Sequence, residues 1–328
     1  MKNNYIFFLL VYTLSYSCDQ PGKSEGANMV TEGSIDRAPV FNADSAYSFI
    51  QDQVDFGPRI PNSTAHKHCA AYLNDKLSGY ADQVTIQEFD SKSQSGEFYR
   101  FKNIVASFNL QANRRILLGA HWDTRMKADK YAADPNVQFD GANDGASGVG
   151  VLIEIARLLS QDSISIGVDI ILFDAEDQGG LGLEWCLGSK YWSNNKHQSG
   201  YSAYYGILLD MVGAKNATFP HEHYSKQFAP SIIDKVWEEG HRAGFGRYFV
   251  YGKGGAIEDD HYYVNVNAKI PMINIIDMVP DGTDRNDAFK AYHHRPSDNM
   301  DIISRETLNA VGTTVVNLLY RESSLVFQ

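Results

Sequence analysis

The segment from Val168 to Gly180, with the sequence VDIILFDAEDQGG, constrains the fold more than any other part of the chain. Residues Ile170–Phe173 are all apolar, which is typical of a strand buried on both faces in a sheet that helices cover. Glu176 and Asp177 follow where this strand ends. Adjacent acids repel each other unless a cation or a shared proton relieves the repulsion. The pair therefore indicates either a solvated acidic turn or a functional site.

Other segments supply the rest of a sheet and its helices. Uninterrupted apolar runs predict buried strands at Arg115–Ala120, Ala203–Leu209 and Ile270–Ile276. Alternating residues predict antiparallel strands at Val84–Phe89 and Phe98–Phe108. Helical spacing and capping residues predict helices at Ala46–Gln53, Thr64–Leu77, Val149–Leu159, Pro230–Gly244 and Thr307–Tyr320. Because strands alternate with helices, we expect an α/β fold: a single domain with a central mixed, mostly parallel sheet covered by helices on both faces.

The first 40 residues are predicted to lie outside that domain. Residues 1–17 have the pattern of a secretory signal peptide, with Lys2, an apolar core and small residues. Cys18 stands where a bacterial lipoprotein is cleaved and lipidated; a plain cleaved signal is the alternative. Residues 18–40 are rich in Gly, Ser, Glu and Asp, as a flexible tether would be, which leaves residues 41–328 as the folded domain. We expect an exported, periplasmic lipoprotein whose lipid anchor is its one membrane contact.

Charge and cysteine content limit the partners. A formal net charge of -11 argues against nucleic acid as a ligand. Cys69 and Cys186 remain after processing. An exported protein could join them in a disulfide, and the sequence leaves open whether they meet.

Acids and histidines follow several of the predicted buried strands and turns. Each has a structural alternative, since Asp123 could cap a turn and Asp144 could cap the helix that follows it. Parallel strands nevertheless bring their carboxyl ends to one edge of a sheet, so these side chains should converge on one crevice. Carboxylates and imidazoles together are suitable ligands for zinc. The candidates are His121, Asp123, Asp144, Glu176, Asp177, Asp210, His293 and His294.

The order of these motifs resembles the zinc-dependent aminopeptidase superfamily, and within it the glutaminyl cyclases of animals and of Bacteroidetes-type bacteria. The segment Leu208–Pro220 (LLDMVGAKNATFP) carries most of the resemblance. Glu258–His261 (EDDH), Cys186–Trp192 (CLGSKYW) and His294–Asn299 (HRPSDN) add to it. The resemblance covers roughly Asn42 to the C-terminus and implies a zinc-dependent cyclotransferase.

The resemblance also implies roles for individual residues. One zinc ion per chain is expected on Asp144, Asp177 and His294, with Glu176 as the catalytic acid. Asp210 and Asp259 match two acids of the family's proton network, and Trp185 matches a tryptophan that lines the substrate pocket. The chain departs from the family at four positions: Asp177 replaces a Glu, His293 a Trp, Asn274 a His and Ala120 a Cys.

The implied substrate is a peptide or protein that begins with glutamine. Zinc would polarise the γ-carboxamide, the substrate's own α-amine would attack it, and Glu176 would carry a proton from the amine to the departing ammonia. We expect the protein to be a monomer. The alternative enzyme is an aminopeptidase with two zinc ions on His121, Asp144, Asp177, Asp210 and His294, in which Glu176 activates water. A receptor or adhesion protein with an inactive site is a third possibility, which would require some of these acids to be missing.

Overall fold

The computed structural model describes residues 1, 38–130, 133–134, 136–281 and 288–325. The chain divides into two units, Met1–Ser34 and Ile35–Gln328, and all the features below belong to the second. The predicted signal peptide, Cys18 and most of the predicted tether lie outside the described residues, so the boundaries at 17 and 40 stay predictions. Among the helices that could be searched, none is both long and apolar enough to cross a membrane.

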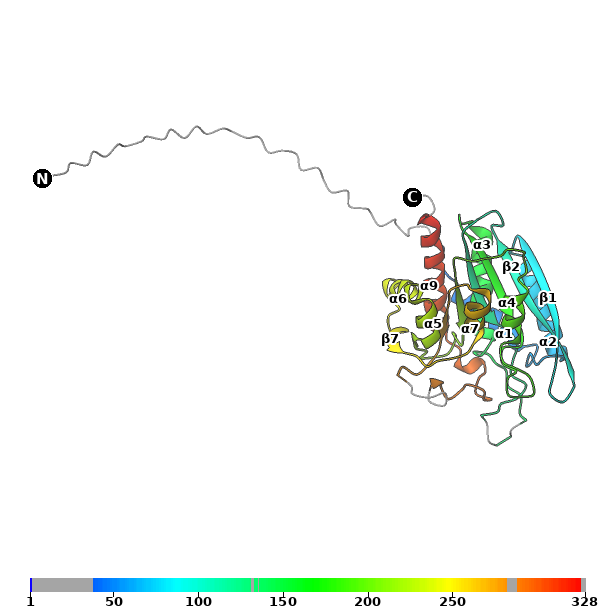
Figure 1. Ribbon diagram of the computed structural model, residues 1–328. Coiled ribbons are helices and arrows are strands. Elements are labelled where there is room, and N and C mark those ends of the chain that lie inside the picture. The colour runs from blue at the N-terminus through cyan, green and yellow to red at the C-terminus, as the bar shows by residue number, and fades with distance from the viewer. Residues whose placement is uncertain (2–37, 131–132, 135, 282–287, 326–328) are drawn as a thin grey trace. The chain divides into compact units, whose positions relative to one another are not determined.

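A six-stranded sheet forms the centre of the domain, in the order β1-β2-β4-β3-β5-β8 (Figure 1). Strands β1 and β2 pair antiparallel, as do β2 and β4, whereas β3 pairs parallel with both β4 and β5, and β5 with β8. This confirms the predicted mixed, mostly parallel sheet. The strands are β1 (Gln83–Lys92), β2 (Phe98–Phe108), β3 (Arg115–His121), β4 (Gly167–Phe173), β5 (Tyr205–Asp210) and β8 (Met272–Ile276).

Helices cover both faces of this sheet. The principal helices are α1 (Ala43–Val54), α2 (Thr64–Ser78), α3 (Ala146–Gln161), α4 (Leu187–Asn194), α6 (Pro230–Arg242) and α9 (Arg305–Ser324). Ile207 and Leu209 of β5 join the larger hydrophobic cluster with α1, α3 and α9. Leu208, between them, joins a second cluster with Trp192 of α4. Because successive strand residues point to opposite faces, this division shows that both faces are buried.

Several short elements were not expected from the sequence. They are β6 (Phe219–His221), α5 (His223–Phe228), β7 (Phe249–Lys253), α7 (Asp260–Tyr263), a π-helix (Val264–Ala268) and a 3-10 helix (Met300–Ile302). Such elements are too short for a hydrophobic period to appear, and tertiary contacts determine them. Three of them, β6, α5 and α7, surround the buried Glu222. Its carboxylate accepts hydrogen bonds from Ser225 N at 2.6 Å and Ile257 N at 3.1 Å.

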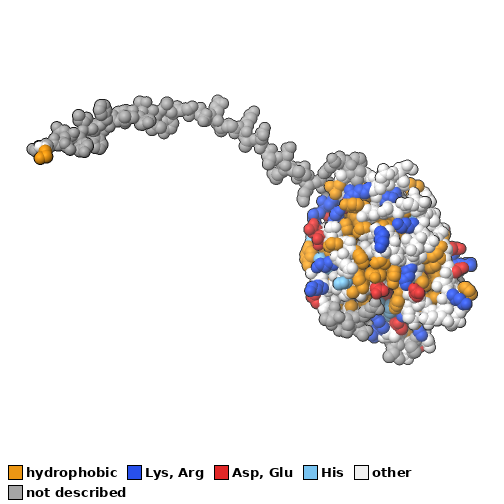
Figure 2. Space-filling model, in the orientation of Figure 1, with side chains coloured by type: hydrophobic (Ala, Val, Ile, Leu, Met, Phe, Trp, Pro, Cys, Tyr) orange, Lys and Arg blue, Asp and Glu red, His pale blue; other side chains and the backbone are white. Residues whose placement is uncertain are grey.

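Two further observations concern cysteine and surface charge. Cys69 and Cys186 are both buried and free, so they form no disulfide. On the face shown in Figure 2, positive and negative side chains are interspersed with hydrophobic ones. The described residues visible there therefore form no continuous basic surface of the kind that binds nucleic acid.

Candidate active site

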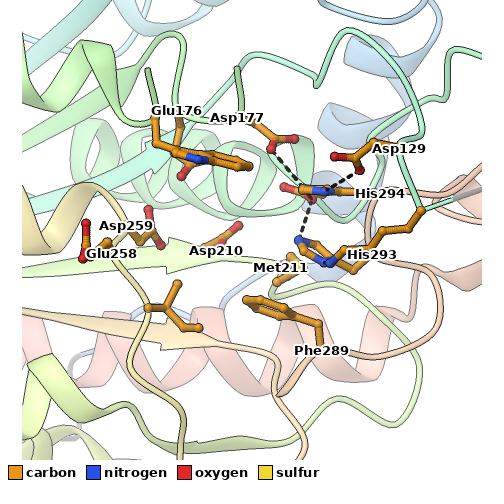
Figure 3. Close-up of a pocket in the computed structure, with 14 residues that line it drawn as sticks. Asp129, Glu176, Asp177, Asp210, Met211, Glu258, Asp259, Phe289, His293 and His294 are labelled. Atoms are coloured by element: carbon orange, nitrogen blue, oxygen red, sulfur yellow. Dashed lines mark hydrogen bonds and ion pairs between the residues drawn. The ribbon is translucent and has the colours of Figure 1, made fainter. Parts of the chain in front are cut away.

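A pocket of about 320 Å³ opens at the edge of the sheet where the parallel strands end. His121 is the last residue of β3, Asp210 is the last of β5, and Glu176 and Asp177 follow β4. The predicted convergence of these strand ends is therefore correct. The residues that line the pocket are Asp129, Lys130, Asp144, Glu176, Asp177, Trp185, Asp210, Met211, Ile257, Glu258, Asp259, Phe289, His293 and His294 (Figure 3).

The backbone around this pocket adopts conformations that side chains usually avoid. Ala175, Met211, Cys186 and His294 are not glycines, yet their φ angles are 56°, 49°, 55° and 55°. Left-handed conformations of this kind have an energetic cost and persist where the surrounding structure enforces them. Their concentration here indicates that the fold holds the site residues in fixed orientations.

His294 contacts both of the other predicted metal ligands, Asp144 and Asp177. His294 Nε2 lies 3.0 Å from Asp177 Oδ1 (Figure 3). It also lies 3.6 Å from Asp144 Oδ2. Ligand atoms of a tetrahedral zinc ion, each about 2.0–2.1 Å from the metal, are separated by roughly 3–3.5 Å. The buried Asp144 Oδ2 has no hydrogen-bond partner among the described residues. The donor types of these three side chains, and the position of His294 between the two acids, suit a zinc ion. The group of possible ligand atoms that all lie within 4.8 Å of one another here contains Asp144, His294 and His293, and Asp177 is outside it.

The charge of this set also favours a cation. Although burial of His294 opposes protonation, Asp177 and Asp129 raise the pKa of its imidazole to about 9. A histidine that retains a proton at such a pH lies in a strongly negative environment. The same environment stabilises a bound metal ion.

A second group of possible ligands shares Asp144. His121 Nε2 lies 3.1 Å from Asp144 Oδ1 and 3.3 Å from Asp210 Oδ1. The two oxygens of Asp144 thus face different histidines, His121 and His294. This arrangement offers the ligand types of a second metal position beside the first.

The predicted proton-carrying acids lie on the pocket wall. Burial, together with the charges of Asp259 and Asp177, raises the pKa of Glu176 well above its ordinary value. Burial and the charge of Asp259 likewise raise the pKa of Asp210 to about 7, in spite of the nearby His121. Glu176 Oε1 accepts a hydrogen bond from the Cys186 thiol at 3.3 Å. A carboxylate with a raised pKa is suited to pass a proton near neutral pH.

The remaining candidates have structural or lining roles. Asp123 caps the turn after β4, because its carboxylate accepts hydrogen bonds from Glu176 N at 3.1 Å and Asp177 N at 3.2 Å. This is the turn-capping role that the sequence allowed for Asp123. Asn274 does not line the pocket and instead donates to Asp259 Oδ2 at 2.6 Å.

Aromatic side chains form the outer wall. Trp185 lines the pocket and stacks on His294, with ring centroids 6.2 Å apart. His293 packs on Phe289, with ring centroids 4.1 Å apart, and so completes this wall.

Sequence reasoning missed other residues of the site. Asp298 accepts hydrogen bonds from Asn143 N at 2.7 Å and Asp144 N at 3.0 Å, and thereby positions Asp144. Asp129, Lys130, Met211, Ile257, Glu258 and Phe289 also line the pocket unpredicted. They lie on irregular segments, where no period reveals the direction of a side chain. Met211, Glu258 and Asp298 nevertheless stood in motifs already singled out.

Comparisons with known proteins agree with this geometry. The sequence profile of peptidase family M28 matches residues 103–319. A glutaminyl cyclase from Porphyromonas gingivalis is 46% identical, with a TM-score of 0.83 over 87% of this chain and 100% of that protein. A zinc-dependent exopeptidase from Parabacteroides distasonis is 44% identical, with a TM-score of 0.82 over 86% of this chain and 99% of that protein.

A more distant relative comes from an animal. The glutaminyl-peptide cyclotransferase of Drosophila melanogaster is 24% identical over 286 residues, which cover 79% of this chain and 75% of that protein. The family match spans more than half of the chain, and the bacterial cyclase matches along its full length. The chain therefore belongs to peptidase family M28, in the branch that contains the glutaminyl cyclases.

Proposed function

We propose that this enzyme is a glutaminyl-peptide cyclotransferase, which converts the N-terminal glutamine of peptides and proteins to pyroglutamate and releases ammonia. One observation carries the proposal: Glu176 stands beside Asp177 on the wall of a pocket that also contains Asp144 and His294. Three protein ligands leave one position of a tetrahedral zinc open for substrate. The similarity to a bacterial glutaminyl cyclase over its whole length supports the same reaction.

Bound zinc supplies a Lewis acid that polarises the γ-carboxamide of the substrate. Glu176 accepts a proton from the attacking α-amine at a carboxylate oxygen and delivers it to the amide nitrogen, which leaves as ammonia. One C–N bond forms and one breaks, so no water is consumed. Trp185 and the aromatic wall orient the glutamine side chain and limit the entry of water.

Asp210 and Asp259 can share protons with the neighbouring acids of the pocket. Burial raises the pKa of both carboxyl groups above their ordinary value. They face Glu176 within the same pocket, so its ionisation is linked to theirs. We assign them to the proton network around Glu176.

A di-zinc aminopeptidase is the second candidate, because His121, Asp144 and Asp210 form a further possible ligand group. We propose one zinc ion per chain, as the resemblance to the glutaminyl cyclases implies. The similarity to a zinc-dependent exopeptidase supports the aminopeptidase as the alternative to test.

Mass spectrometry separates the two reactions. A peptide that starts with glutamine should lose ammonia and remain otherwise intact, and metal analysis should give one zinc per chain. A shortened peptide with a new N-terminus, together with free glutamine and two zinc ions per chain, would instead identify an aminopeptidase.

We also propose that the protein is an exported, periplasmic lipoprotein anchored through Cys18, and that it is a monomer. The sequence pattern of residues 1–18 supports the anchor. The wild type should partition with membranes, whereas Cys18→Ser should not be lipidated. Recovery of both proteins in the soluble fraction would rule out the anchor.

Light scattering tests the proposed monomer. A molar mass near that of one chain is expected.

A further inference from the structure

A buried arginine lies behind the potential zinc ligands. The Arg125 side chain is only 3% exposed, and its Nη1 donates to the backbone oxygen of Asp177 at 2.8 Å. The same Nη1 lies 3.5 Å from Asp177 Oδ1. Arg125 therefore holds both the main chain and the carboxylate of one ligand.

The other arm of this guanidinium leads to a second ligand. Arg125 Nη2 donates to Asp129 Oδ2 at 2.5 Å. The second oxygen of Asp129 lies 3.2 Å from His294 Nδ1, on the side of the imidazole opposite Nε2 (Figure 3). This contact is an ion pair, because Nδ1 makes no hydrogen bond of good geometry among the described residues. Asp177, Arg125, Asp129 and His294 thus form one continuous chain of polar contacts.

This chain of contacts also reaches the substrate wall. The guanidinium carbon of Arg125 lies 4.6 Å from the centre of the Trp185 ring, and Trp185 stacks on His294. A cation over an indole face is attracted by the ring's electron density. Arg125 therefore touches the wall as well as the metal end of the pocket.

His294 needs such support for two reasons. Its φ angle of 55° is a left-handed conformation, which a histidine adopts at an energetic cost. An imidazole that binds zinc through Nε2 is also best oriented when its Nδ1–H donates to a carboxylate, which fixes the tautomer and the plane of the ring.

We propose that Asp129 and Arg125 are positioning residues of the zinc centre: Asp129 orients His294, and Arg125 fastens Asp129 to Asp177. A simple surface ion pair four residues apart is the competing interpretation, and such pairs contribute little. The burial of Arg125 and its contacts with Asp177 and Trp185 favour the positioning role.

Zinc affinity tests this inference directly, by competition with a chelator at constant pH. Asp129→Ala should bind zinc about 10–100-fold more weakly than the wild type. Asp129→Asn keeps an acceptor for His294 but loses the charge, so its affinity should fall between the two. Arg125→Met should also weaken binding. In the double variant Asp129→Ala/Arg125→Met the loss should be smaller than the product of the two single losses, because both residues act through one pathway.

Arg115→Met is the matched control. Arg115 is a second buried arginine, paired with Asp169 at the opposite end of β3. This variant should be less stable yet bind zinc with the affinity of the wild type. A loss of stability without a loss of affinity in Asp129→Asn, or equal affinity in Asp129→Ala and the wild type, would overturn the proposal.

This positioning role rests on the zinc centre of the proposed function. Zinc binding and pyroglutamate formation by the wild type show which of the two proposals has failed. If the wild type binds no zinc, the proposed function itself fails. If the wild type binds zinc and forms pyroglutamate while both Asp129 variants keep full affinity, only the positioning role is wrong.

Discussion

The two ends of the central sheet hold buried acids in opposite ways. Where β3 and β4 begin, Asp169 is surrounded by donors: Arg115 Nε at 2.7 Å, Ser107 Oγ at 2.6 Å and Tyr201 OH at 2.9 Å. The charge of Asp169 is therefore matched within the protein, as a structural ion pair requires.

At the end where these strands finish, acids outnumber their partners. Five acids line the pocket, Asp144, Glu176, Asp177, Asp210 and Asp259, and their ion-pair partners are His121, His293, His294 and Arg125. Among the described residues, Asp144 Oδ2 has no hydrogen-bond partner. Buried negative charge in excess of its donors favours a cation or a proton. The comparison shows that the number of partners, rather than burial alone, separates a structural acid from a functional one.

The largest expected effect is at the end with excess charge. Glu176→Gln should lower kcat about 10²–10⁴-fold, because the amide cannot carry the proton, while zinc content stays unchanged. Steady-state kinetics with a glutamine-initiated peptide measures the effect. Glu184→Gln, which changes an exposed acid in the following loop, is the control and should keep full activity. Full activity in Glu176→Gln would remove this residue from the mechanism.

The balanced end should respond in stability instead. Asp169→Ala leaves Arg115 buried without its charge partner, which should lower the free energy of unfolding by about 3–5 kcal/mol. Chemical denaturation measures that loss, and the zinc affinity of the folded protein should equal that of the wild type. Weaker zinc binding in Asp169→Ala would show that the two ends are coupled.

Glu222 sharpens the comparison, because it is a fully paired acid close to the site. Burial opposes its ionisation, yet His261 and nearby backbone amides lower the pKa of Glu222 from 4.5 to about 2. An acid with a depressed pKa in the folded state stabilises the fold above its ordinary pKa, and that contribution is lost as the pH falls. Stability should therefore decline by about 3 kcal/mol between pH 4.5 and 2 on account of this group.

Glu222→Gln tests the assignment by denaturation at several pH values. The variant should be less stable than the wild type at pH 7, and the difference should shrink as the pH falls toward 2, because the wild-type carboxylate becomes protonated. A difference that stays constant with pH would mean that the side chain acts by shape and hydrogen bonding alone. Burial lowers the pKa of His261, but the charge of Glu222 outweighs this effect and raises it above its ordinary value. Stability should therefore fall a second time as the pH rises through the pKa of His261 in the folded protein.

The smallest effect is expected at the pocket wall. A Cβ on Gly179 would lie 2.0 Å from Trp185 Cγ, so Gly179→Ala should displace the indole. We expect KM to rise about 5-fold, equivalent to about 1 kcal/mol, with kcat changed less. Gly79→Ala is the control, since a Cβ there meets nothing nearer than 3.4 Å. An unchanged KM would show that Trp185 does not orient the substrate.

Hydrophobic patterning was sufficient to predict most of the fold. The apolar runs that became β3, β4, β5 and β8 reveal burial on both faces, and the helical periods of α3 and α6 reveal the cover. The short elements around Glu222 were not predicted, because contacts between distant residues stabilise them rather than a local period.

The sequence by itself determined which acids and histidines stand at strand ends, since a residue that follows a buried strand must emerge at the edge of the sheet. Glu176, Asp177 and Asp210 were predicted in this way, whereas Asp144 and His294 were candidates on a turn and a loop. All five line one pocket. Only the tertiary structure decided that Asp169 is balanced by Arg115, that Asp123 caps a turn, and that Asp129 and Arg125 stand behind His294. The physical reason is that the effect of a buried charge depends on its partners, and folding brings those partners from distant parts of the chain.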